Sequence, residues 1–200
     1  GRYAVLPVRK IVEDLEAGRA LPERAVGISI DDGFVSVAAE AWPRFKKAGL
    51  PFTLFTATDY HHQPIRGYLS WDQIREMARD PLVDFGHHSA SHRHMADATP
   101  KINRAELDKA FAVWEEKIGR RPVLFAYPFG EASGEAIEVV RSAGFIAAFG
   151  QHSGAFGPEM VKSDVERFYL PRFAFNENWG EEKRFRQALN TVALPAIDIT

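Results

Sequence analysis

The chain has 200 residues, of which 46% are hydrophobic, and its formal net charge at pH 7 is −2. This size suits one globular domain, and we expect a single domain over residues 1–200. Because 25 basic and 27 acidic side chains nearly cancel, the composition favours neither nucleic acid nor an anionic membrane as a partner. No apolar run approaches the roughly 20 residues of a transmembrane span.

The chain contains no cysteine. Disulfides and thiolate chemistry are therefore excluded, and any metal has to be held by histidine and carboxylate side chains. The sequence begins with Gly1 and not with methionine, so we expect the domain to be truncated at its ends. The lack of a signal peptide consequently says little about location.

Helices and strands are predicted to alternate along the first half of the chain. Helical periodicity or strand-like apolar runs predict, in chain order, a helix over 6–18, a strand over 25–30, a helix over 36–49, a strand over 51–57, a helix over 70–80 and a strand over 82–86. Pro43 is expected to kink or break the second helix. Ser70 and Gln73 have the spacing of a capping box.

The alternation continues in the second half. We predict a helix over 99–119, a strand over 123–130, a helix over 133–144, strands over 145–150 and 167–175, and a last helix over 181–190. Thr99 is the expected N-cap of the long helix, and Pro100 its first residue.

Repeated strand–helix units indicate an α/β fold whose parallel strands are joined by crossover helices. The strands are nearly continuous apolar runs, which is typical of a sheet covered on both faces. An open doubly wound sheet and a (β/α) barrel both fit this pattern. In either fold, reactive residues belong at the C-terminal ends of the strands.

Polar residues do collect at these ends. Asp31 and Asp32 follow the strand 25–30, His88 and His92 follow the strand 82–86, and Arg172 is expected at the end of the strand predicted over 167–175. An Asp-Asp-Gly sequence is also common in turns, and a histidine pair four residues apart is often only a solvated helix start. Together, one Asp and two His give three ligands of a kind that a divalent metal, Zn²⁺ above all, accepts with positions left open.

The other histidines receive different predictions. In a helical turn His88 and His92 would share a face, whereas His87 and His94 would point elsewhere, beside the ligands or to the surface. His61 and His62 are expected to face solvent.

The ordered motifs "ISIDDGF", "HSASH" and "FAYPFG" resemble those of the polysaccharide deacetylases, the NodB-homology or carbohydrate esterase 4 family. Flanking stretches such as "PFTLFTATD" and "LPRFAFNE" resemble the branch of poly-N-acetylglucosamine deacetylases. The resemblance covers residues 25–175. It implies a distorted (β/α)7 barrel and metal-dependent hydrolysis of acetyl groups, N-acetyl above all, on a polysaccharide or oligosaccharide.

Carried over to this chain, the resemblance makes Asp31 the general base and Asp32, His88 and His92 the metal ligands. The implied metal is divalent, with Zn²⁺ expected ahead of Co²⁺, Ni²⁺ or Fe²⁺. The residues implied to shape the substrate groove are Tyr127, Pro128 and Phe129. Arg172 is the arginine expected to orient the base, in preference to Arg121, which lies at the opposite end of its strand.

One family feature is missing, because no Leu-x-His motif follows Arg172. The general acid then lies in a truncated segment or is another group, for which His152 is the candidate. Trp71, Phe129 and Trp179 are considered as sugar-stacking residues, although packing is the more usual role of each.

The implied partner is an N-acetylated glycan, and an envelope glycan would favour an extracytoplasmic location. Two alternatives remain: hydrolysis of a small amide or cyclic ureide by the same fold, or a degenerate domain that binds glycan without cleaving it.

Overall fold

The computed structural model describes residues 3–61, 67–176 and 180–191. Its central feature is a five-stranded parallel sheet in the order β3-β4-β5-β6-β7. The strands are β3 (Ser29–Ile30), β4 (Phe52–Thr56), β5 (Val83–His87), β6 (Leu124–Ala126) and β7 (Ala147–Phe149). Each strand lies beside its predecessor, so the strand order never reverses. In a doubly wound sheet, by contrast, the order reverses at one point. The sequential order supports the predicted distorted barrel.

A small parallel pair, β1 (Ala4–Val5) and β2 (Ala25–Val26), forms a separate two-stranded sheet. The single strand predicted over 25–30 is therefore wrong. The chain changes neighbours at Gly27, pairing with β1 before it and with β4 after it. Helix α1 packs against this point, because a Cβ on Gly27 would meet the Val8 side chain at 3.0 Å.

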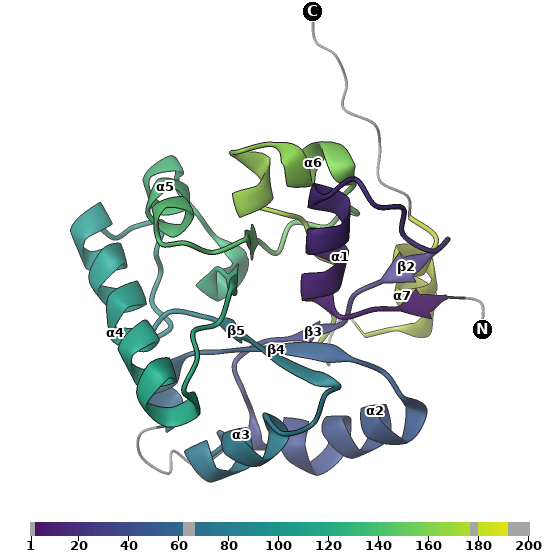
Figure 1. Ribbon diagram of the computed structural model, residues 1–200, viewed down its shortest axis with the longest axis horizontal. Helices are drawn as coiled ribbons and strands as arrows, with labels where there is room; N and C mark the ends of the chain where they lie inside the picture. Colours follow the sequence, from purple (N-terminus) through teal and green to yellow (C-terminus); the bar gives the residue numbers. More distant parts are fainter. Residues whose placement is uncertain (1–2, 62–66, 177–179, 192–200) are drawn as a thin grey trace, which may run out of the picture.

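Helices lie around the sheet in the arrangement shown in Figure 1. They are α1 (Val8–Glu16), α2 (Trp42–Ala48), α3 (Trp71–Met77), α4 (Pro100–Ile118), α5 (Gly134–Ser142), α6 (Pro158–Lys162) and α7 (Glu182–Leu189). Shorter helical turns occur at Val37–Ala41, Thr58–His61, Pro128–Gly130 and Glu166–Phe168. None of the helices in the described ranges combines the length and apolar character that crossing a membrane requires.

The strand residues alternate between two packed faces. On β4, Phe55 joins a cluster with α1, whereas Phe52 and Leu54 join a cluster with α3 and α4. On β6, Leu124 packs on the α1 side and Phe125 on the α4–α5 side. Both faces of the sheet are thus buried, as the apolar runs predicted. Gly86 is required here, because a Cβ would lie 2.1 Å from the Phe55 ring.

Several predicted helix boundaries are confirmed. Ser70 and Gln73 form the reciprocal capping box of α3, and Thr99 caps α4 by accepting from the Ile102 N–H. The helix predicted over 36–49 is a π-helical turn followed by α2, with the change just before Pro43. This is the expected effect of a proline without an N–H.

The strand predicted over 167–175 is wrong. Its first residues form a 3-10 turn, and only Leu170 pairs with the sheet, through an isolated parallel bridge to Phe149. The Arg172 N–H still donates to the His152 carbonyl, 3.0 Å away. This segment therefore runs along β7 without being a regular strand, and it brings Arg172 to the C-terminal edge of the sheet.

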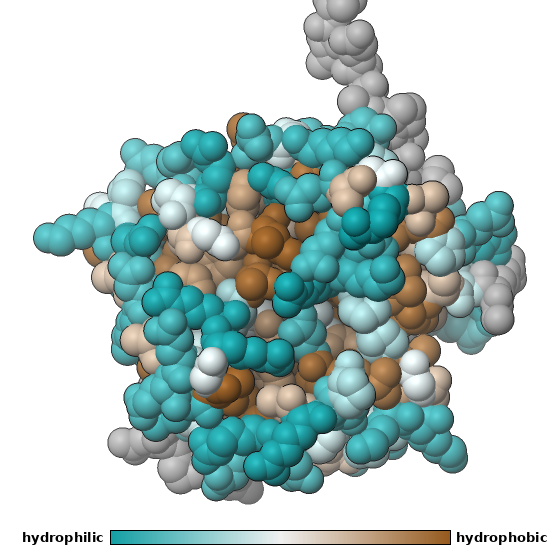
Figure 2. Space-filling model, viewed as in Figure 1, coloured by the Kyte–Doolittle hydropathy of each residue, from teal (hydrophilic) through white to brown (hydrophobic). Residues whose placement is uncertain are grey.

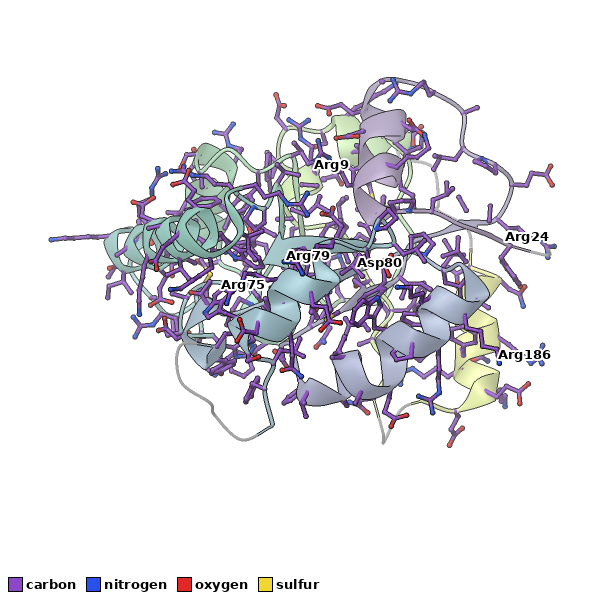
Figure 3. The ribbon with its side chains drawn as sticks, turned by 60° about the horizontal axis from the view of Figure 1, so that its bottom comes forward. Arg9, Arg24, Arg75, Arg79, Asp80 and Arg186 are labelled. Atoms are coloured by element: carbon purple, nitrogen blue, oxygen red, sulfur yellow. The ribbon has the colours of Figure 1, made fainter. Side chains whose placement is uncertain are left out.

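The surface view looks onto a face with hydrophobic atoms gathered toward its middle and hydrophilic side chains around them (Figure 2). Charged side chains project from the helices into solvent, among them Arg75 and Arg79 near α3 (Figure 3). Asp80, which follows α3, is an exception because it is buried. It accepts hydrogen bonds from the Trp42 indole and the Leu82 N–H.

Candidate active site

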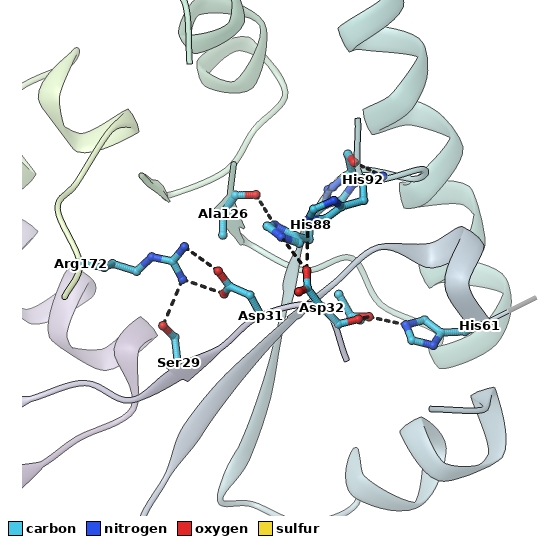
Figure 4. Close-up of polar contacts among 11 residues, drawn as sticks. Ser29, Asp31, Asp32, His61, His88, His92, Ala126 and Arg172 are labelled. Atoms are coloured by element: carbon cyan, nitrogen blue, oxygen red, sulfur yellow. Dashed lines mark hydrogen bonds and ion pairs between the residues drawn. The ribbon is translucent and has the colours of Figure 1, made fainter. Parts of the chain in front are cut away.

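Asp31 and Asp32 follow β3 directly and lie side by side (Figure 4). Asp32 has a φ of 72° and Gly33 a φ of 77°, so the chain makes a tight left-handed turn here. A Cβ on Gly33 would come within 2.5 Å of the Thr56 hydroxyl oxygen, so only glycine fits. The turn directs two neighbouring carboxylates to the same edge of the sheet.

Two buried side chains, those of Thr56 and His61, hold this turn in place. The Thr56 hydroxyl contacts the Asp32 carbonyl oxygen at 3.2 Å and is hydrogen-bonded to His61. The His61 Nδ1 lies 2.6 Å from the Leu69 carbonyl oxygen. His61 is only 4% exposed, so the prediction that it faces solvent is wrong. His62 lies outside the described residues.

The second histidine motif begins at the end of β5. His88 is buried, and its Nδ1 donates to the Ala126 carbonyl oxygen at 2.7 Å. This bond leaves Nε2 of His88 free to act as a metal ligand, an arrangement that fixes the ring of many metal-binding histidines.

His92 reaches the same place by a route that the sequence did not predict. Residues 88–92 are not helical, because Ser89 and His92 have φ values of 63° and 54°. The Ser89 hydroxyl accepts from the His92 N–H. The Glu106 carboxylate of α4 accepts from the N–H groups of Ala90 and Ser91. The helical face expected to unite the two histidines is thus replaced by a tight loop.

These three side chains converge. The Asp32 Oδ1 lies 3.5 Å from His88 Nε2 and 3.1 Å from His92 Nε2, and one ligand atom of each residue lies within 4.8 Å of the others. Burial raises the pKa of Asp32, but in the absence of a metal the contacts of the two histidines outweigh this and hold it well below the usual value. One carboxylate and two converging imidazoles fit a divalent metal.

Asp31 is held by a different partner. Arg172 donates to both of its carboxylate oxygens, at 2.7 and 2.8 Å, and also to the Gly150 carbonyl oxygen and the Ser29 hydroxyl. Burial raises the pKa of Asp31, but the charge of Arg172, followed by that of His88, lowers it below the usual value. Asp31 is therefore ionised and oriented. Arg121 instead pairs with Glu115 on the surface.

The "FAYPFG" motif forms the turn after β6. Tyr127 is fully buried, and its hydroxyl donates to the Phe168 carbonyl oxygen. Pro128 is also buried, whereas Phe129 is 47% exposed and has a φ of 60°. The Phe129 ring stacks on His94 at 3.8 Å and contacts His92 at 4.6 Å. Of the three side chains, only that of Phe129 is accessible to a ligand.

The other histidine and tryptophan candidates that the structure describes belong to the core or to the surface. His87 is buried among Phe111, Phe125 and Phe145, and burial lowers its pKa to about 3. His94 is exposed and pairs with Glu131. Trp71 belongs to the core, packed edge-on against Trp114, and Trp179 lies outside the described residues.

His152 is exposed and stacks on Tyr169, with ring centres 4.7 Å apart. Sequence reasoning missed Thr56, Glu106 and the inward role of His61. Their contacts depend on how separate elements pack, and nothing in their local sequence marks them.

The chain is similar to known proteins over most of its length. A family model described as polysaccharide deacetylase matches residues 18–148. The chain is 25% identical to the poly-beta-1,6-N-acetyl-D-glucosamine N-deacetylase of Escherichia coli K12, over 95% of this chain and 33% of that protein. It is 26% identical to the enzyme of that name from Staphylococcus epidermidis, over 84% of this chain and 60% of that protein.

The chain thus spans between a third and 60% of the length of these two curated relatives. Among solved structures, the Streptococcus pyogenes deacetylase PplD superimposes with a TM-score of 0.82 at 16% identity, covering 94% of this chain and 80% of that one. IcaB from Ammonifex degensii gives 0.77 at 21% identity, with coverage of 93% and 81%. These likenesses confirm the NodB-type barrel. Since the family model matches well over half of its residues, the chain belongs to the polysaccharide deacetylase family.

Proposed function

We propose that this chain is the catalytic domain of a metal-dependent hydrolase that removes N-acetyl groups from a polysaccharide. The observation that carries the proposal is the convergence of Asp32, His88 and His92 beside an Asp31 that Arg172 holds in place. A group of this kind at the C-terminal ends of parallel strands supports a reaction on a bound substrate and not a structural metal alone.

Asp32, His88 and His92 are the proposed ligands, and Zn²⁺ is the ion that this donor set favours. When bound, a divalent cation supplies Lewis acidity, polarising the acetyl carbonyl and lowering the pKa of a coordinated water. The chain itself supplies much of the site, since the Ala126 carbonyl fixes the ring of His88 and the Ser89 hydroxyl fixes the backbone of His92.

Asp31 is the proposed general base. Its lowered pKa keeps it ionised at neutral pH, ready to accept a proton from the attacking water. The bidentate contact with Arg172 fixes the direction of the carboxylate. Arg172 thus acts through Asp31, as a positioning residue.

The oxyanion that develops on the substrate carbonyl needs a hydrogen-bond donor. The Tyr127 N–H already donates to the Phe149 carbonyl oxygen, and Pro128 has no N–H. Phe129 is the next residue of the turn, and its left-handed backbone and contact with His92 place it beside the metal ligands. We assign the donor to its backbone N–H, and we expect its exposed ring to border the bound substrate.

His152 is the proposed proton donor to the leaving amine. It follows β7, at the same edge of the sheet as the other groups, and its backbone carbonyl is bound by the Arg172 N–H. Burial lowers its pKa, so the imidazole is largely neutral at pH 7. It therefore has to receive a proton before it can deliver one.

The names of the curated relatives make poly-β-1,6-N-acetylglucosamine the first substrate to test. A substrate of the cell envelope would place the protein outside the cytoplasm. The test is acetate release from β-1,6-linked N-acetylglucosamine oligomers by protein treated with EDTA and then resupplied with Zn²⁺ or Co²⁺. We expect acetate release only after metal is returned. The proposal would be contradicted if the metal-loaded protein released acetate from none of the N-acetylated glycans tested.

A glycan-binding domain without activity is the second candidate. A Bacillus anthracis structure described as a carbohydrate esterase 4 family pseudoenzyme shares the fold at a TM-score of 0.56. The complete set of metal-ligand candidates together with Asp31 and Arg172 argues against this reading. The same acetate assay separates the two, because such a domain would bind oligomers and release nothing.

A further inference from the structure

Three aromatic side chains form a continuous row beside the candidate site. The ring of Phe34 stacks on Tyr68 with centres 4.9 Å apart and an angle of 28°, and Tyr68 contacts Tyr60 at 4.4 Å. Phe34 follows the Asp-Asp-Gly turn, whereas Tyr60 and Tyr68 lie in the connection from β4 to α3. We call these three residues the aromatic row.

The backbone fixes the aromatic row in place. Phe34 and Tyr68 form an isolated antiparallel bridge. The Val35 N–H donates to the Gly67 carbonyl oxygen at 2.7 Å, and the Leu69 N–H donates to the Gly33 carbonyl oxygen at 2.9 Å. The row is therefore attached to the same turn that positions Asp31 and Asp32.

The row also reaches the metal ligands. The Tyr60 ring lies 5.9 Å from the His92 ring, and the Asp32 carboxylate acts electrostatically on both tyrosine hydroxyls. His92 also contacts Phe129 at 4.6 Å. Aromatic rings from two separate loops thus lie beside this candidate ligand.

Packing alone does not explain this surface. Phe34 is 42% exposed, although it is a large apolar side chain next to two carboxylates. Tyr60 and Tyr68 are partly exposed, and their hydroxyls are hydrogen-bonded to each other. Each oxygen still has a lone pair for a ligand. Phe34 and Tyr68 cover one face of each other. The exposed part of the row, bordered by hydroxyls, suits an uncharged ligand with apolar C–H faces and polar edges, and a pyranose ring has this chemistry.

We propose that Phe34, Tyr60 and Tyr68 form a subsite that stacks on a sugar ring next to the residue being deacetylated, so that the site selects oligomers over the monosaccharide. This inference rests on the proposed function, because the neighbouring ring belongs to the same glycan. It assigns the stacking role to residues other than the tryptophans that the sequence suggested.

The test measures glycan binding directly. Protein carrying Asp31→Asn, to prevent turnover, is loaded with Zn²⁺ and titrated calorimetrically with a β-1,6-linked N-acetylglucosamine hexamer and with the N-acetylglucosamine monomer. We expect the hexamer to bind at least about tenfold tighter than the monomer, and Phe34→Ala to remove about that factor, as expected for one aromatic stacking contact.

Matched variants separate stacking from general damage. Phe185→Ala removes a similarly exposed phenylalanine from α7 and should leave hexamer affinity unchanged. Phe34→Trp and Tyr68→Phe keep an aromatic face and should retain binding, whereas Tyr68→Leu should lose it. Unchanged unfolding midpoints and Co²⁺ affinities would show that the fold and the ligand site are intact in each variant.

Two results would overturn the subsite: a hexamer that binds no tighter than the monomer, or a Phe34→Ala variant that loses no more affinity than Phe185→Ala. The outcome is independent of the acetate assay. Hexamer binding that depends on Phe34 in a chain that releases no acetate would support the subsite and refute the deacetylase. Acetate release with an unchanged kcat/KM for the hexamer in Phe34→Ala would support the deacetylase and refute the subsite.

Discussion

The two ends of the parallel strands are built differently. At the C-terminal ends, Asp32, Ser89, His92 and Phe129 all have positive φ, and among the described residues Arg24 is the only other non-glycine residue with this backbone. Each such residue costs on the order of 1–3 kcal/mol of conformational energy. At the N-terminal ends, before β5 and β6, the backbone is ordinary and charged groups make conventional surface or cap contacts.

Two arginine–carboxylate pairs make the contrast concrete. Arg172–Asp31 and Arg121–Glu115 are both bidentate. The first pair is largely buried at the C-terminal edge, with side chains 13% and 23% exposed, whereas the second is more than half exposed. The same kind of ion pair therefore orients a site residue at one end of the sheet, whereas at the other end it contributes little to stability. The following predictions test this division.

The largest effect is expected at the metal ligands. His88→Ala and Asp32→Ala each remove one of three donors, so metal affinity should fall by more than about 100-fold, and deacetylation should fall with it. Equilibrium dialysis with Zn²⁺ or the absorption spectrum of bound Co²⁺ measures the affinity. His94→Ala, which removes a nearby exposed histidine, should keep the metal. Retention of metal by the first two variants would disprove the ligand assignment.

Asp31→Asn is expected to separate binding from chemistry. The amide cannot accept a proton, so kcat should drop by about 100-fold or more, the range of general base catalysis. Metal affinity should stay within a few-fold of the unmodified chain, because Asp31 is not among the three converging ligand residues. Full turnover by this variant would remove Asp31 from the mechanism.

The two arginines provide a direct comparison. Arg172→Ala should lower kcat/KM about 10- to 100-fold, whereas Arg121→Ala should leave it unchanged. Arg172 lowers the pKa of Asp31, so its removal raises that pKa. Since Asp31 works only when deprotonated, the acid limb of the kcat/KM–pH profile should move to higher pH. An unshifted limb in Arg172→Ala would contradict the positioning role.

A smaller effect is expected from Glu106, which holds the 88–92 loop through the Ala90 and Ser91 N–H groups. Glu106→Ala should weaken metal binding about tenfold, as removal of a group behind the ligands commonly does. Glu138→Ala on α5, an exposed partner of Arg141, is the control. Equal metal affinities in the two variants would show that the loop keeps its shape without Glu106.

The sequence predicted the fold and the site unequally well. Strand–helix alternation and the strand-end rule placed Asp31, Asp32 and His88 at one edge, because β3 and β5 are regular where these residues emerge. The long helix α4 carried its own signals in Thr99 and Pro100. These features are local, and local chemistry can be read from sequence.

The failures are all non-local. Whether residues 25–30 form one strand or two depends on α1 packing at Gly27, and whether 167–175 becomes a strand depends on its fit along β7. His61 is buried because Thr56 and Leu69 accommodate it. The aromatic row escaped prediction because it joins two segments through the Phe34–Tyr68 bridge.

The smallest effect is expected far from the site, at Asp80. Asp80→Ala leaves the Trp42 indole and the Leu82 N–H without their acceptor, so the free energy of unfolding should fall by about 1–2 kcal/mol while kcat/KM stays unchanged. The Leu82 hydrogen bond, followed by that from Trp42, lowers the pKa of Asp80. A carboxylate whose pKa is lower in the folded than in the unfolded state stabilises the fold. This contribution is complete when the pH is above the unfolded-state pKa near 4, and it is lost as the pH falls through the folded-state pKa. Urea denaturation measures the free energy of unfolding of the unmodified chain and of Asp80→Ala at pH 7 and at pH 3. The difference between the two proteins should be smaller at pH 3. An equal difference at both pH values would mean that Asp80 acts through packing and not through its charge.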